Sequence, residues 1–159
     1  GINPTAIIGG KVLNFDSNAR TGQGEYIVFE ADESDGSFLR LLPTIAVVTN
    51  IDADHMDYYK YFEGLKDAFL KYINNVPFYG YAILCMDDNV VAELLPKVER
   101  PFVTYGFSEN ANFRAKNVKN NYNNTAFDCF FNEDLLGNVE IPLLGNHNVL
   151  NSLAVKSVS

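Results

Sequence analysis

The sequence lacks the features that mark several common protein classes. Its 159 residues include no tryptophan, two histidines and two cysteines, Cys85 and Cys129. Each cysteine sits in an apolar run, so we expect buried thiols in a reducing compartment, with neither a disulfide framework nor zinc-binding spacing. No apolar run approaches the roughly 18 residues of a membrane span, and no signal peptide is recognisable. These absences predict a cytoplasmic protein without membrane contact.

A basic face is also missing. The formal net charge is −8 and the pI is about 4.6, which argues against a nucleic-acid partner. Phosphate groups can still be bound through metal ions and backbone N–H groups. The chain is 47% hydrophobic, so it can bury a core of its own.

Strand and helix patterns alternate over residues 1–111. Apolar runs predict buried strands, and helical spacing or a cap-and-stop pattern predicts helices between them. The expected strands are 27–29, 45–50, 81–85 and 102–105, and the expected helices are 62–73 and 90–95, the second capped within 87–89. This alternation predicts an α/β fold with a mostly parallel sheet flanked by helices.

The pattern changes after residue 111. Short strand-like runs separated by Asn/Gly turns predict an antiparallel meander over 112–144. Its strands are expected at 113–118, 126–131 and 139–143, with turns at 120–124 and 136–138. Residues 145–159 read as a helix with no stop signal. We therefore expect residues 1–159 to form a single, partial domain.

Two polar loops follow predicted strands. The first, EADESDGSF, carries Glu30, Asp32, Glu33 and Asp35; it indicates a Mg²⁺ ligand or, alternatively, a solvated acidic turn that caps a helix. The second, TNIDADHMD, carries Asn50 and then Asp52, Asp54, His55 and Asp57; it indicates a second cation site or a histidine that only caps a helix. If the two strands are neighbours in one parallel sheet, one edge carries Glu30 and His55 side by side.

A third motif, GNHNVLN, opens the last predicted helix. Asn148 and Asn151 are three positions apart and share a helical face. Amide side chains suit the edge of a purine, and a helix N-terminus favours phosphate. The alternative is plain N-capping by Asn146 or Asn148.

In the order EADESDGSF, TNIDADHMD, NNVPFYGYAILCMDD, TYGFSENA and GNHNVLNSLA, these motifs resemble the central domain of the Mur ligases over nearly the whole chain. The resemblance implies an ATP- and Mg²⁺-dependent ligase that forms an amide bond through an acyl phosphate in peptidoglycan synthesis. The best match is to the members that use UDP-N-acetylmuramic acid and L-alanine. The family's phosphate-binding loop, G-T-x-G-K-T-T, is expected upstream of Gly1, and the UDP-binding and C-terminal domains are also expected outside the chain, so the chain alone should be inactive.

The resemblance also implies roles for particular residues. Glu30 resembles the family's ligand for the Mg²⁺ on the β- and γ-phosphates, and His55 the ligand for a second metal ion. Asn50 belongs to a T-N pair near the reacting groups, while Asn148 and Asn151, preceded by His147, resemble residues around the adenine. Asp32, Asp54 and Asp57 are expected to support the metal ligands.

Three other interpretations stay open. A murein-peptide recycling ligase or another Mur-family amino-acid ligase shares the fold. A metal-dependent phosphohydrolase would use the acids around His55, although the chain offers only one further histidine, His147. A non-catalytic nucleotide- or metal-binding domain would leave the acids merely solvated.

Overall fold

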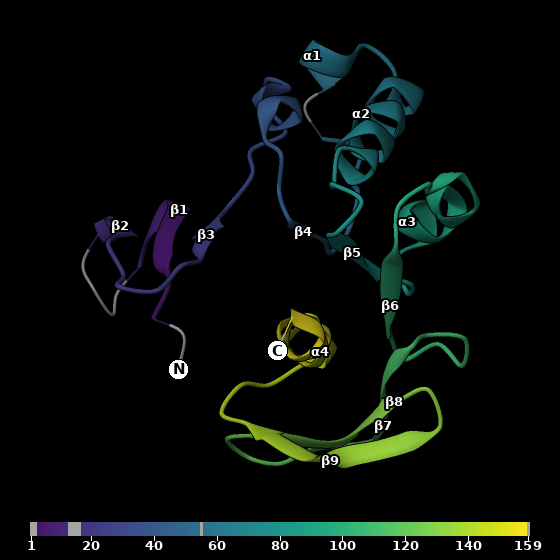
Figure 1. Cartoon of the computed structure of the whole chain (residues 1–159). Helices are drawn as coiled ribbons and strands as arrows, with labels where there is room; N and C mark the ends of the chain where they lie inside the picture. The colour runs from purple at the N-terminus through teal and green to yellow at the C-terminus, as the bar shows by residue number, and fades with distance from the viewer. Residues whose placement is uncertain (1–2, 13–16, 55, 159) are drawn as a thin grey trace.

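The computed structural model describes residues 3–12, 17–54 and 56–158 (Figure 1). Its largest unit is a six-stranded sheet in the order β4-β5-β6-β7-β8-β9. Strands β4 (Ile45–Val48), β5 (Tyr81–Cys85), β6 (Phe102–Gly106) and β7 (Phe113–Asn120) pair in parallel. Strands β8 (Thr125–Phe131) and β9 (Asp134–Ile141) continue it antiparallel. The predicted parallel sheet and meander are therefore parts of one sheet.

Helices cover both faces of the parallel strands. On one face lie α2 (Phe62–Asn74) and α3 (Asn89–Leu94), followed by the short 3-10 helix η2 (Leu95–Lys97). On the other face α4 (Asn146–Val158) lies between β4–β6 and the curled β7–β9 strands (Figure 1). Strand side chains alternate between these layers: Leu84 belongs to the core under α2 and α3, whereas Ile83 belongs to the core under α4.

Local sequence explains several of these elements. The apolar residues of α2 recur at helical spacing, and Leu65, Tyr72 and Ile73 are buried against the sheet. Asp88 caps α3, because its Oδ1 accepts a hydrogen bond from Val91 N at 2.8 Å. The helices predicted at 62–73 and 90–95, and the turn at 120–124, are confirmed within a residue or two.

The predicted turn at 136–138 is wrong. Those residues lie inside β9, which begins at Asp134. The chain instead reverses at Asn132 and Glu133, where Asn132 adopts a left-handed φ of 52° that asparagine tolerates well. Gly137 is opposite Cys129, next to a shift in the β8–β9 register, so its role is to accommodate an irregular strand.

Three strands within residues 5–12, 17–20 and 27–29 form a separate sheet, which the sequence patterns did not predict. Strand β1 (Thr5–Val12) pairs antiparallel with β2 (Ser17–Arg20) and parallel with β3 (Ile27–Phe29). An extended segment and the 3-10 helix η1 (Ser37–Arg40) lead from β3 to β4, and Figure 1 shows this sheet set apart from the rest. Strand β3 was predicted as buried; Ile27 and Val28 are 64% and 54% exposed.

Candidate functional site

The two acidic loops lie against each other, although their strands belong to different sheets. The Tyr59 hydroxyl, at the end of α1 (Met56–Tyr59), donates a hydrogen bond to the carbonyl oxygen of Glu33. Next to it, the Tyr58 ring covers Gly36: a Cβ at Gly36 would lie 2.5 Å from the Tyr58 hydroxyl oxygen. Gly36 also has a left-handed φ of 71°, so both conformation and space favour glycine there.

The acids of the first loop also affect Tyr59 electrostatically. Burial, then Tyr58 and the Glu33 carboxylate, raise the pKa of Tyr59 to about 12. The phenol is therefore neutral at physiological pH and remains a hydrogen-bond donor to the loop.

Two of the acids shape the loop itself. Asp32 Oδ1 accepts a hydrogen bond from Ser34 N at 2.9 Å, and Asp35 Oδ1 accepts one from Ser37 N at 2.8 Å. The Ser37 hydroxyl and backbone N–H also lower the pKa of Asp35. These contacts favour the turn interpretation for Asp32 and Asp35, which fold the backbone into tight turns.

Glu30 is placed differently. It follows β3 and is exposed, and its Oε2 accepts a hydrogen bond from Gly9 N of β1 at 2.8 Å. Sequence reasoning missed Gly9, because the contact spans 21 residues and β1 carried no recognised pattern. A Cβ at Gly9 would lie 3.3 Å from the same carboxylate oxygen, so glycine leaves the room that this contact needs.

The expected shared sheet edge requires a correction. Strand β3 pairs with β1, and β4 pairs with β5, so the strands that precede the two loops are not neighbours in one sheet among the described residues. His55 lies outside the described residues, so its distance from Glu30 stays a prediction. The loops meet through Tyr58 and Tyr59 instead.

The second loop holds Asn50 in one orientation. The Thr49 hydroxyl donates to Asn50 Oδ1 at 3.0 Å, and Asn50 Nδ2 donates to Asp52 Oδ2 at 2.7 Å. All three side chains are exposed just beyond the carboxyl end of β4. Asp52 is thus a direct partner of Asn50.

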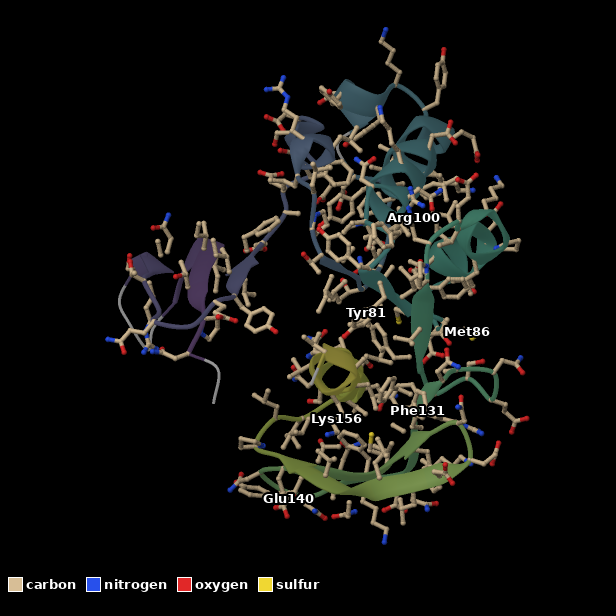
Figure 2. All side chains as sticks on the ribbon, viewed as in Figure 1. Tyr81, Met86, Arg100, Phe131, Glu140 and Lys156 are labelled. Carbon is tan, nitrogen blue, oxygen red and sulfur yellow. The ribbon has the colours of Figure 1, made fainter. Side chains whose placement is uncertain are left out.

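The start of α4 reaches the same edge of the six-stranded sheet. Tyr81, at the beginning of β5, donates from its hydroxyl to the carbonyl of Ser157 near the end of α4 (Figure 2). Val149, at the start of the helix, shares a core with Cys85 at the end of β5. The helix therefore runs antiparallel to β5, and its N-terminus lies beside the carboxyl ends of β4 and β5, where open α/β sheets bind ligands.

At that N-terminus, Asn148 does not act as a simple N-cap. Its Nδ2 donates to the Leu144 carbonyl at 2.9 Å and lies 3.0 Å from His147 Nε2. Asn151 is exposed on the next turn. The fold brings Asn50 and Asn148 to one edge of the sheet.

No cluster of three or more His, Cys, Asp or Glu side chains is arranged as a metal site among residues 3–12, 17–54 and 56–158. Mg²⁺ takes one or two carboxylates together with waters and substrate phosphates, so a single exposed carboxylate such as Glu30 fits that donor set. Likewise, within the described part of the chain, no helix is long and apolar enough to cross a membrane.

Comparison with known families fits this geometry. The Mur ligase middle domain family matches residues 11–158. The fold and the loop-bearing sheet edge define an open α/β domain, and the chain belongs to the Mur ligase middle domain family.

Individual relatives show which members of the family the chain is similar to. The chain is 52% identical to UDP-N-acetylmuramate–L-alanine ligases of Endomicrobium trichonymphae and Geotalea uraniireducens, over 99% and 100% of its length. It spans 35% of the length of these relatives. Among solved structures, UDP-N-acetylmuramate:L-alanyl-gamma-D-glutamyl-meso-diaminopimelate ligase from Neisseria meningitides matches 99% of this chain and 52% of its own, with 26% identity and a TM-score of 0.83.

Proposed function

We propose that this chain is the central part of a cytoplasmic, ATP-dependent ligase that joins L-alanine to UDP-N-acetylmuramic acid in peptidoglycan synthesis. The observation that carries the proposal is the 52% identity to ligases of that name along the whole chain.

The proposed reaction has two steps. The muramyl carboxylate attacks the γ-phosphorus of ATP, which gives an acyl phosphate and releases ADP. The amine of L-alanine then attacks the activated carbonyl carbon, and inorganic phosphate leaves. Two anions, the carboxylate and the triphosphate, approach each other in the first step. Bound Mg²⁺ would supply the positive charge that offsets their repulsion.

Residues of this chain have defined places in the proposal. Glu30 would hold the Mg²⁺ of the β- and γ-phosphates through its carboxylate, one oxygen of which accepts a hydrogen bond from Gly9 N. His55 would hold the second cation. Asn50, oriented by Thr49 and Asp52, would lie near the reacting carboxylate, and Asn148 and Asn151 would contact the adenine.

The two separate sheets support a place for the phosphate-binding segment. Strands β3 and β4 are both edge strands, each in a parallel pair, and each carries exposed apolar side chains: Ile27, Val28 and Val47. Unpaired parallel edges with apolar faces are normally covered. We propose that the strand leading into the phosphate-binding loop of the full-length ligase pairs with both edges, and so makes one sheet.

The experiment that tests the function uses the full-length ligase. With UDP-N-acetylmuramic acid present, wild-type enzyme should release ADP over many turnovers only when L-alanine is added. Glu30→Ala should reduce this release at least about a thousandfold, because an oriented metal ligand is lost where charge develops. Glu25→Ala, an exposed acid in the loop before β3, is the matched control and should retain wild-type release. Near-normal ADP release by Glu30→Ala would refute the role of Glu30.

A further inference from the structure

The backbone of Tyr59 is held in a tight turn between α1 and α2. Its carbonyl oxygen accepts a hydrogen bond from Tyr61 N at 2.7 Å, and Lys60 between them has a left-handed φ of 62°. Gly64, on the first turn of α2, leaves room for this turn, because a Cβ there would lie 3.0 Å from the same carbonyl oxygen. The turn therefore fixes Tyr59 relative to α2 and to the strands that α2 covers.

From this fixed position the side chain of Tyr59 reaches the acidic loop. Tyr59 and Ala31, the second residue of that loop, are both partly buried against the core under α2. The Tyr58 and Tyr59 rings meet edge to face, with their centroids 4.9 Å apart and their planes at 79°. One ring thus covers Gly36, while the hydroxyl of the other donates to the Glu33 carbonyl oxygen.

These contacts join two loops whose preceding strands belong to different sheets. Glu30 opens the first loop after β3, and His55 comes directly before α1, which ends at Tyr59. The Tyr59 hydroxyl holds the first loop three residues beyond Glu30. It therefore ties the backbone that carries one proposed cation ligand to the helix that follows the other.

We propose that Tyr59 is a positioning residue whose hydroxyl makes the two loops one unit, so that the two cation sites of the reaction form together. This inference rests on the proposed function. Mg²⁺ requires near-ideal octahedral geometry, so displacement of a loop that carries a ligand weakens its binding. Tyr59 acts through the backbone of the acidic loop and needs no contact with the substrate.

The test uses Tyr59→Phe in the full-length ligase, because this change keeps the ring and removes only the hydroxyl. For the loss of one hydrogen bond, we expect the free Mg²⁺ concentration at half-maximal ADP release to rise about fivefold, and kcat at saturating Mg²⁺ to change less than about twofold. With a non-hydrolysable ATP analogue bound, the Kd for Mn²⁺, measured by electron paramagnetic resonance, should rise by the same factor. Tyr61→Phe loses the same atom from a side chain that is 76% exposed, and should match the wild type in each measurement.

A further measurement needs no variant. In the wild-type ligase with the same analogue bound, backbone amides of residues 31–37 and 56–61 should become protected from hydrogen exchange at one common Mg²⁺ concentration, because the loops are coupled. Two separate midpoints would overturn the inference, as would a Tyr59→Phe enzyme with the wild-type dependence on Mg²⁺ and Mn²⁺. A wild-type enzyme that releases no ADP in response to L-alanine is a distinct result: it would overturn the ligase proposal, and the Mn²⁺ titrations would still decide the role of Tyr59.

Discussion

At the scale of single residues, several carboxylates hold the backbone in place by accepting hydrogen bonds from backbone N–H groups. Asp88 caps α3 within its own turn, which local sequence predicts. Its neighbour Asp87 instead accepts from Phe107 N at 2.6 Å and Ser108 N at 3.0 Å, and so holds the loop after β6 at the sheet edge. The sequence predicted both as helix caps. The long-range role of Asp87 depends on the pairing of β5 with β6, which no local pattern specifies.

The two cysteines give a prediction at this scale. Cys85 and Cys129 are free and buried, and burial raises the pKa of both thiols. In native protein at pH 8, neither thiol should react with DTNB over minutes, whereas in guanidinium chloride both should react at once. Because the folded-state pKa values are raised, the stability from keeping these thiols protonated is present below the unfolded pKa of about 8.5 and is lost as the pH rises above it. Rapid labelling of the native chain would contradict this burial.

At the scale of elements, α4 connects the parallel strands to the meander. Val149, Leu153 and Ala154 are buried among residues of β5, β6, β7 and β8, whereas Val155 on the opposite side is 71% exposed. Figure 2 places Lys156 on the side of α4 that faces the meander. The packing of α4 against these strands therefore fixes the position of its N-terminus at the sheet edge.

Substitution on the two faces of α4 should separate packing from surface effects. Leu153→Ala should lower the free energy of unfolding by about 2–5 kcal/mol, because it leaves a cavity between helix and sheet. Val155→Ala, on the exposed face, should change it by less than about 0.5 kcal/mol. Urea denaturation of the 159-residue chain measures both. Equal losses for the two variants would mean that α4 is not packed as described.

At the scale of the whole molecule, β3 and β4 are the parallel edge strands of the two sheets among the residues that the structure describes. The proposed additional strand would pair with both. Glu30 and the loop after β4 would then lie at the ends of strands that flank a single intervening strand, which is how the metal ligands of the proposed reaction could converge.

Hydrogen exchange tests this arrangement. Backbone amides of β3 and β4 that face the free edges should exchange rapidly in the 159-residue chain and on the order of a hundredfold more slowly in the full-length ligase, because pairing closes them to solvent. Amides of β8, an interior strand flanked by β7 and β9, provide the internal control and should be protected in both proteins. Equal exchange of the β3 and β4 amides in the two proteins would rule out the additional strand.

The sequence by itself determined the elements that depend on residues close together in the chain. Helical spacing fixed α2, Asp88 fixed the start of α3, apolar runs fixed β5 and β6, and the Asn-rich turn fixed the β7–β8 hairpin. These features persist because their hydrogen bonds and packing periodicity repeat within a few residues.

Only the tertiary structure decided which strands became neighbours. It paired β3 with β1 and did not make β3 a neighbour of β4. It also brought the acidic loops together through Tyr58 and Tyr59. Finally, it set Asn148 at the sheet edge that carries Asn50. Strand pairing is a long-range choice: it depends on which apolar faces and backbone edges remain available once the chain has folded, and a short run such as 27–29 carries no record of its partner.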